Sequence, residues 1–211
     1  MAAHYPAFFD QVERIVVHDP LAEFLGAAES GRIEYGYLDA VKLAGHSCPT
    51  VAGAYLTTLR ALRALYPAAT PERGAIRVRL RDEMESGVTG VIAQVAGLIT
   101  GATQQNGFKG IGGRFDRRNL LFFGAGIDAE LQFERVDTGA AVSASFRAEA
   151  IPGSARLKAL MGKLGTQGLT AAEQHELGAE WQARVKRILI DEADNPALVL
   201  VNAVASERVA V

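Results

Sequence analysis

Two side chains that commonly bind metals, an imidazole and a thiol, lie one residue apart in the run Gly45-His46-Ser47-Cys48-Pro49. Cys48 is the single cysteine of this 211-residue chain, and His46 is one of four histidines. Pro49 opens the run 50–66, in which apolar residues recur at helical spacing. Proline suits the first position of a helix, because its missing N–H would have no partner there. We therefore expect Cys48 at the N-terminus of a helix.

The chemistry expected at this position is that of a reactive sulfur. A thiol at a helix N-terminus meets the positive end of the helix dipole and unpaired backbone N–H groups. Both favour the thiolate of Cys48, the form that binds metals and attacks electrophiles. The neutral imidazole of His46 would supply a second ligand. The competing interpretation is structural, with Cys48 as a small buried apolar residue and His46 as a polar contact before the helix.

The run 45–49, followed by Gly53-Ala54-Tyr55, resembles the Gly-His-x-Cys-Pro signature of the FmdE-like proteins, a family named after a component of formylmethanofuran dehydrogenase. A second similar stretch is Thr100-Gly101-Ala102-Thr103, where the family often has Thr-Gly-Cys-Thr. The resemblance extends from about Phe8 to about Ala148. Family members of known structure carry a transition metal at the His-x-Cys site. The resemblance therefore implies a metal bound by His46 and Cys48, with zinc expected and iron or nickel as alternatives.

The chain departs from the family in its cysteines. Ala102 stands where a family cysteine is expected, and the C-terminal Cys-rich zinc ribbon of some members is missing. The resemblance therefore implies one metal site at most, with its other ligands unidentified. Two protein ligands do not complete a four-coordinate structural zinc site. An incomplete set predicts an open site that binds a small molecule or passes on its metal, and it leaves open whether the protein is an enzyme.

Further ligands are sought among His18, Glu83 and Glu85. His18 lies beside a carboxylate at a predicted helix break, where a helix cap is the plainer interpretation. Glu83 and Glu85 belong to an acidic cluster after a predicted strand, and the plainer interpretation is favourable charge before the next helix. A second copy of the chain or an exogenous ligand remains the alternative source of ligands.

A glycine-rich, basic loop covers residues 103–118. Its glycines are compatible with an anion-binding backbone nest, with Lys109 and Arg114 as flanking cations, but a mobile loop is the plainer interpretation. The glycine spacing fits neither a Walker nor a dinucleotide-binding motif. A mobile loop without a ligand, a lid or an oligomer contact is the alternative.

Helices and strands are both expected along the chain. Residues 75–81 alternate apolar residues with arginines, as a half-buried strand does, and Thr170 with Glu173 forms a capping box. We expect helices over 6–17, 21–28, 35–44, 50–66, 88–100, 154–164 and 170–191, and strands over 75–81, 119–123, 129–136 and 142–150. These elements predict an α+β fold with an antiparallel or mixed sheet of about four to five strands and helices mainly on one face.

The domain prediction separates residues 1–150, a metal-binding α+β domain, from residues 151–211, a C-terminal helical extension that packs on the same domain. The apolar run 198–201 is expected to add an edge strand to this sheet or to that of a second copy of the chain. An apolar arm of this kind suits a homodimer.

Composition narrows the classes of partner. The net charge is −2 and no basic stripe with interleaved aromatic residues occurs, so nucleic acid is not expected. No apolar stretch reaches the length of a membrane span. One cysteine allows no internal disulfide and suits the reducing cytoplasm. Two other functions stay open: a metal-free enzyme with Cys48 as nucleophile, and a non-catalytic component of a larger assembly.

Overall fold

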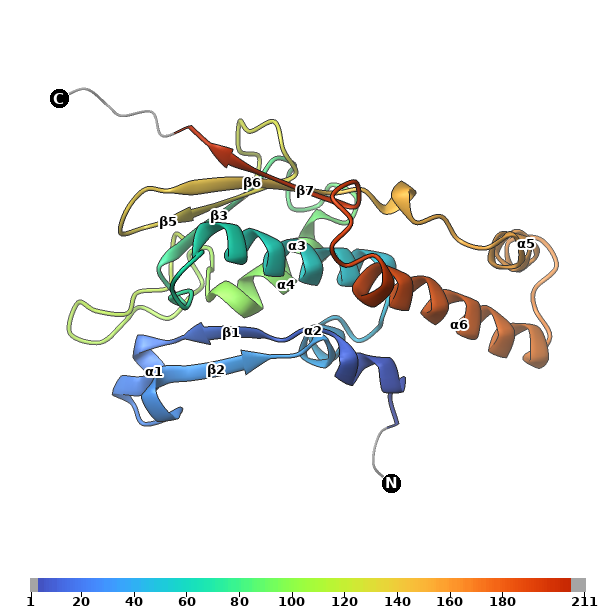
Figure 1. Cartoon of the computed structure of the whole chain (residues 1–211), viewed down its shortest axis with the longest axis horizontal. Helices are drawn as coiled ribbons and strands as arrows, with labels where there is room; N and C mark the ends of the chain where they lie inside the picture. Colours follow the sequence, from blue (N-terminus) through green and yellow to red (C-terminus); the bar gives the residue numbers. More distant parts are fainter. Residues whose placement is uncertain (1–3, 206–211) are drawn as a thin grey trace.

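The structure is a computed structural model that describes residues 4–205. Its centre is helix α3 (Pro49–Leu65), which lies between a five-stranded sheet and a two-stranded hairpin (Figure 1). Thirteen residues of α3 are buried, so the helix faces protein on most of its sides. Its apolar residues therefore form the middle of the core, with the sheet above them and the hairpin below them in Figure 1.

The five-stranded sheet is mixed. Its strand order is β4-β3-β5-β6-β7, in which β4 is parallel to β3 and the other pairs are antiparallel. The strands are β3 (Ile76–Leu80), β4 (Leu121–Phe122), β5 (Leu131–Arg135), β6 (Ala141–Phe146) and β7 (Val199–Val204). The predicted α+β fold is confirmed, and so is a mixed sheet of this size.

The remaining helices surround α3 or continue the C-terminal part of the chain. They are α1 (Pro20–Phe24), α2 (Tyr37–Ala44), α4 (Thr89–Thr100), α5 (Ala155–Leu164) and α6 (Ala171–Lys186), followed by a π-helical turn over Arg187–Asp191. Thr170 is the N-cap of α6, and its capping box with Glu173 is present as predicted. No helix within residues 4–205 is both long and apolar enough to cross a membrane.

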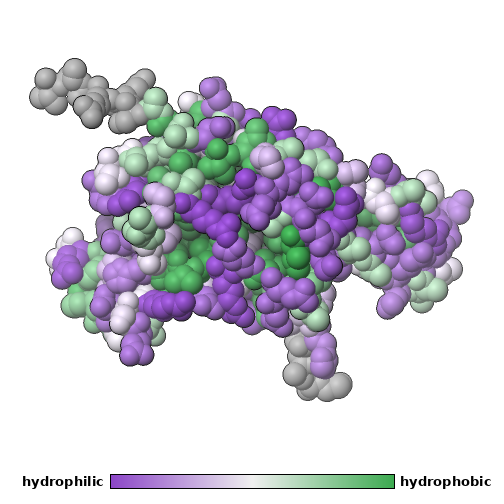
Figure 2. All heavy atoms as spheres, viewed as in Figure 1, coloured by the Kyte–Doolittle hydropathy of each residue, from purple (hydrophilic) through white to green (hydrophobic). Residues whose placement is uncertain are grey.

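In the C-terminal part of the chain, α5 and α6 project from the core, and β7 then joins the large sheet. Helices α5 and α6 extend beyond the end of the sheet (Figure 1), and hydrophilic side chains cover most of this projecting part (Figure 2). Val185 and Ile188 are buried in the core, and β7 then pairs with β6. The extension therefore supplies a strand as well as helices, and the expected edge strand lies on this chain's own sheet.

The N-terminal region differs from the prediction. The expected helix over 6–17 is instead a 3-10 turn over Ala7–Gln11 followed by strand β1 (Ile15–His18). Strand β1 pairs antiparallel with β2 (Arg32–Tyr35), which was not expected as a strand. The apolar residues before His18 satisfy helical spacing by coincidence, whereas their β-branched side chains suit the strand that β2 completes. The chain must also turn back after α1 to reach β2, so α1 ends before residue 28.

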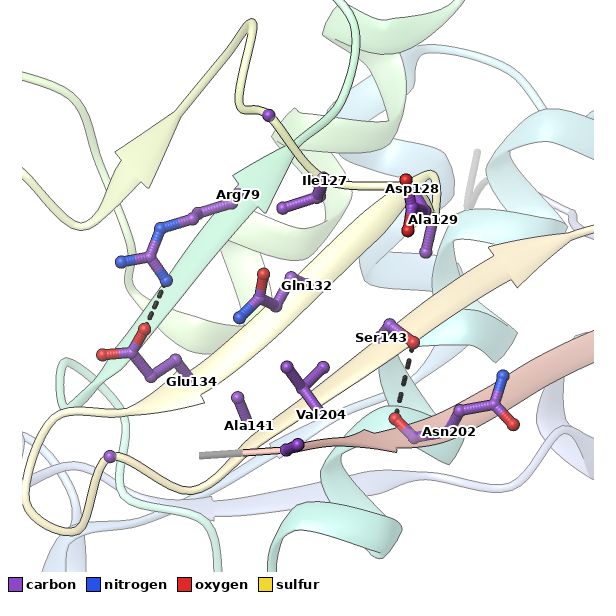
Figure 3. A pocket seen from close by; sticks show the side chains of 13 residues that line it. Arg79, Ile127, Asp128, Ala129, Gln132, Glu134, Ala141, Ser143, Asn202 and Val204 are labelled. Carbon is purple, nitrogen blue, oxygen red and sulfur yellow. Dashed lines mark hydrogen bonds and ion pairs between the residues drawn. The ribbon is translucent and has the colours of Figure 1, made fainter. Parts of the chain in front are cut away.

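The two faces of the large sheet have different environments. Leu131 and Phe133 on β5 point into the core, toward the layer of α3 and α4. The opposite face is a broad polar concavity of about 1000 Å³ (Figure 3). On it Arg79 pairs with Glu134, and Ser143 donates a hydrogen bond to the backbone carbonyl of Asn202. Helices thus cover one face, as expected, because that face carries the large buried apolar residues.

Candidate metal centre

The run 45–49 forms the junction between α2 and α3. Gly45 ends α2 in the left-handed conformation, with φ 74° and ψ 2°, and donates its N–H to the carbonyl of Val41. A residue with a side chain is disfavoured in that conformation, so glycine suits the turn. Cys48 follows with an extended backbone as the N-cap of α3, and Pro49 occupies the first helical turn. The predicted position of Cys48 is confirmed.

The sulfur of Cys48 lies at the N-terminus of α3. Its Sγ accepts the backbone N–H of Val51 at 3.4 Å, so it satisfies one of the amides that a helix start leaves free. The residue is 9% exposed. The sulfur is thus a helix cap, and Cys48 belongs to the buried core.

His46 is exposed, and its ring orientation is set by the backbone. The ring Nδ1 lies 2.9 Å from the carbonyl oxygen of Ala44. A carbonyl oxygen only accepts, so Nδ1 carries the proton in this hydrogen bond. The lone pair of the neutral ring is then on Nε2, which forms no hydrogen bond with any residue in the described range 4–205. A histidine that donates one ring N–H to a carbonyl and presents the other nitrogen has the arrangement typical of metal ligands.

Ser47, between the two candidate ligands, is held by the distant helix α6. Its hydroxyl donates to Gln182 Oε1 at 2.9 Å and lies 2.9 Å from the hydroxyl of Tyr37. Its carbonyl accepts Trp181 Nε1–H at 3.1 Å and Gln182 Nε2–H at 3.2 Å. Burial raises the pKa of Tyr37 well above its usual value, so the phenol remains a donor to Ser47. These contacts fix the backbone between His46 and Cys48.

Sequence reasoning did not find this support. No local pattern links Trp181 or Gln182 to Ser47, because both lie more than 130 residues from it. The one hint available was that Trp181 is the single tryptophan of the chain. A buried indole N–H usually finds a polar partner, but the sequence does not say which one.

The structure does not bring His18 to the candidate centre. The backbone of His18 bonds to Pro71 and Arg73, which follow the C-terminal end of α3, and its Nε2 lies 2.9 Å from Glu23 Oε2. Cys48 is at the N-terminal end of α3. The 17 residues of that helix span about 25 Å. His18 therefore lies at the opposite end of the core from Cys48.

Glu83 and Glu85 are exposed in the turn that follows β3. The carboxylate of Glu83 packs beside Gly124. The turn leads into α4, whose first residues share a cavity with the first turn of α3, so both glutamates lie toward the same end of the molecule as Cys48. Within residues 4–205, however, no three His, Cys, Asp or Glu side chains gather as metal ligands would. No third donor is therefore found beside His46 and Cys48 among the described residues.

The basic loop packs far from this centre. Ile111 and Arg114 exchange two backbone hydrogen bonds, of 2.9 and 3.0 Å, around two glycines with positive φ, which makes a tight hairpin turn. The guanidinium of Arg114 stacks on Phe115 at 4.6 Å and lies 5.9 Å from the ring of Phe24 in α1. Lys109 is exposed. The loop therefore lies at the His18 end of the core, and anion binding there stays a prediction.

Comparison with known proteins finds a solved structure that is similar to this chain. No protein-family profile and no curated protein matches the chain. The chain is similar in structure to a tungsten formylmethanofuran dehydrogenase FmdE-like protein from Syntrophus aciditrophicus. The similarity covers 82% of this chain and 74% of that one, with a TM-score of 0.46 and 12% sequence identity. That protein carries the name of the family that the run 45–49 resembles.

Proposed function

We propose that the α2–α3 junction binds one transition-metal ion, with zinc as the first candidate, through Nε2 of His46 and Sγ of Cys48. The observation that carries this proposal is the 2.9 Å hydrogen bond between His46 Nδ1 and the carbonyl of Ala44. This hydrogen bond leaves the lone pair of the neutral ring on Nε2. The sulfur of Cys48, two residues later, lies at the N-terminus of α3.

The donor set fits an open site better than a closed one. An imidazole nitrogen and a thiolate suit zinc, and also iron or nickel. A closed structural zinc site takes four protein ligands, whereas no group of three or more His, Cys, Asp or Glu side chains occurs within residues 4–205. The remaining positions would belong to water, a small molecule or a second copy of the chain. A metal bound in this way supplies Lewis acidity, which polarises a carbonyl or acidifies a bound water.

The chain's own contribution is to hold the two donors in position. The Ala44 carbonyl fixes the ring of His46, and the Val51 N–H fixes the sulfur of Cys48. Trp181 and Gln182 hold the backbone between them through Ser47. Such supporting contacts are typical of metal sites, where removing one costs about 10- to 100-fold in affinity.

The test is metal content in protein purified without a histidine tag. We expect near-stoichiometric metal in the wild type and its loss in His46→Ala. The matched control is His175→Ala, because His175 is an exposed histidine on α6 away from the junction. With cobalt in place of zinc, we expect a thiolate-to-cobalt absorption band that Cys48→Ser lacks.

Two results would overturn the proposal. One is a wild-type protein that retains no metal after incubation with excess zinc and dialysis. The other is equal metal content in His46→Ala and His175→Ala. If metal is absent and iodoacetamide alkylates Cys48 rapidly at neutral pH, the nucleophilic function replaces the metal-binding one. The low exposure of Cys48 argues against that result.

A further inference from the structure

The two edges of the large sheet differ in length and in protection. The strand order ends with β4 on one side and with β7 on the other. β4 spans two residues, whereas β7 spans six, with the sequence Val-Leu-Val-Asn-Ala-Val. Natural proteins protect a sheet edge by keeping its strand very short, or by placing a charged residue, a proline or a bulge in it. β4 is protected by its shortness, whereas β7 contains neither a charged residue nor a proline.

The pairing of β7 with β6 determines which of its backbone groups are free. The register is continuous along the whole of β7, so no bulge interrupts it. The N–H of Arg147 donates to the carbonyl of Leu198 at 2.8 Å, so the even-numbered residues of β7 are the ones that bond to β6. The N–H and carbonyl groups of Val201 and Ala203 therefore point away from β6. Within residues 4–205, none of these groups has a hydrogen-bond partner.

The side chains leave this edge accessible. Val201 is half-buried against the core, and the next three residues of β7 are exposed, with Val204 36% exposed. Figure 3 shows Asn202 and Val204 at the border of the polar concavity on the open face of the sheet. A free, uncharged edge that solvent reaches is a template for a further strand.

We propose that β7 pairs antiparallel with β7 of a second copy of the chain, so that the two large sheets join into one. In the register centred on Asn202, Val201 lies opposite Ala203 of the second copy, and Ala203 lies opposite its Val201. Each free N–H then donates to a free carbonyl of the other chain. Asn202 faces its own copy in a non-hydrogen-bonded pair, where side chains come closest. The contact is isologous, so it closes as a dimer.

Three observations favour a second copy as the occupant. Identical strands without charge do not repel each other, and an uncharged edge offers no charge complementarity to an acidic or a basic partner. The amide of Asn202 both donates and accepts, so it complements itself across a twofold axis. Six residues follow the described range, and β6 has no residue opposite them, because it begins at Ala141 opposite Val204. An antiparallel second copy supplies a strand past that point.

The first experiment measures the mass of the full-length protein in solution by light scattering over a dilution series, with a chelator present. We expect twice the chain mass of 22.4 kDa. Asn202→Asp and Asn202→Lys each place like charges opposite each other at the axis, and each should raise the dimer dissociation constant at least about tenfold.

The matched control is Gln132→Glu, which also turns an amide into an acid on the open face. Gln132 lies in the same row as Asn202 but two strands further from the edge. At about 4.8 Å per strand, its two copies are about 24 Å apart in the dimer, where salt screens their repulsion. Gln132→Glu should therefore dimerise as the wild type does.

A mixture separates the loss of this contact from misfolding. Equimolar Asn202→Asp and Asn202→Lys should form a mixed dimer at least about tenfold more tightly than either variant pairs with itself, because opposite charges then meet. Ala203→Pro removes an outward N–H and leaves the bonds to β6 intact, so it should give a folded monomer. His46→Ala should dimerise as the wild type does, which separates this proposal from the metal proposal.

The proposal is overturned if the full-length wild type is a monomer at about 100 μM. It is equally overturned if the mixture pairs no more tightly than the single variants, or if Gln132→Glu weakens the dimer as much as Asn202→Asp. A monomer that dimerises only after deletion of residues 206–211 would mean that the end of the same chain covers the edge. A dimer that the chelator abolishes would mean that a metal, rather than β7, joins the two chains.

Discussion

At the scale of single residues, Cys48 has two roles, and substitutions can separate one from the other. Its sulfur accepts the Val51 N–H as a helix cap, and the same atom is the proposed metal donor. Capping requires an acceptor at the N-cap, which a hydroxyl provides as well as a sulfur does. Binding a soft or borderline metal requires the thiolate itself. Substitutions that preserve one property and remove the other therefore report on each role.

We predict that Cys48→Ser leaves the stability of the metal-free protein close to that of the wild type, whereas Cys48→Ala lowers it by about 1 kcal/mol through loss of the cap. Both variants should lose bound metal. Urea unfolding of the metal-free proteins and metal analysis of the purified ones provide the measurements. Stoichiometric zinc in Cys48→Ser would show that the sulfur is not a ligand.

At the scale of elements, the closeness of α3 to the sheet depends on Gly53. A Cβ built on Gly53 would lie 2.4 Å from ring carbons of Phe146 in β6, which is well inside contact distance. Helix and strand can approach this closely only because the helix lacks a side chain at that point. The same approach forms one wall of the cavity of about 170 Å³ between α3, α4 and the sheet, since Phe146 lines it.

We predict that Gly53→Ala destabilises the protein by about 1–3 kcal/mol, because the ring of Phe146 must move within a packed core. The control is Gly178→Ala, also in a helix, where a Cβ would meet no described atom within 4 Å. That change should stabilise the protein by about 0.5–1 kcal/mol through helix propensity. Thermal or urea unfolding measures both, and a shift of both variants in the same direction would contradict the packing argument.

At the scale of the whole molecule, one carboxylate joins segments that are far apart in the chain. Asp19 is 3% exposed, and it caps α1 through the N–H groups of Leu21 and Ala22. Its oxygens also accept Arg73 Nη1 at 2.9 Å and Arg117 Nη2 at 2.7 Å. The N-terminal hairpin, the segment after α3 and the end of the basic loop therefore meet at one buried ionic cluster.

We predict that Asp19→Asn lowers the stability at pH 7 by about 3 kcal/mol, because it leaves the buried Arg117 and the partly buried Arg73 without their counter-charge. Asp116→Asn, which removes an exposed pair with Arg118, should change stability little. Urea unfolding at pH 7 measures both changes. Equal effects of the two substitutions would mean that the buried cluster does not contribute as expected.

The same cluster predicts a pH dependence. Burial alone would raise the pKa of Asp19, but the Ala22 N–H and the charges of Arg73 and Arg117 outweigh burial and lower that pKa below its usual value. A lowered pKa in the folded state stabilises the protein above the unfolded value of about 3.9, and this contribution is lost as the pH falls through the folded pKa. The difference between wild type and Asp19→Asn should therefore shrink in unfolding measurements below about pH 4.

Elements with strong local patterns were predictable from the sequence. Helix α3, strand β3 and the start of α6 agree with the expected ranges to within a few residues, because periodicity, Pro49 and the capping box act within one turn of the chain. Strand β1 was not predictable in this way. Its residues satisfy helical spacing, and only pairing with β2, itself unexpected, makes them a strand.

The candidate site, too, has features that local sequence patterns predict and features that depend on the tertiary structure. The sequence alone determined that Cys48 caps a helix and that His46 lies beside it, because proline and glycine act on their immediate neighbours. Only the tertiary structure decided that Trp181 and Gln182 hold Ser47 and that His18 lies at the far end of α3. Those contacts join residues far apart in the chain, and packing of the whole core selects them rather than any local pattern.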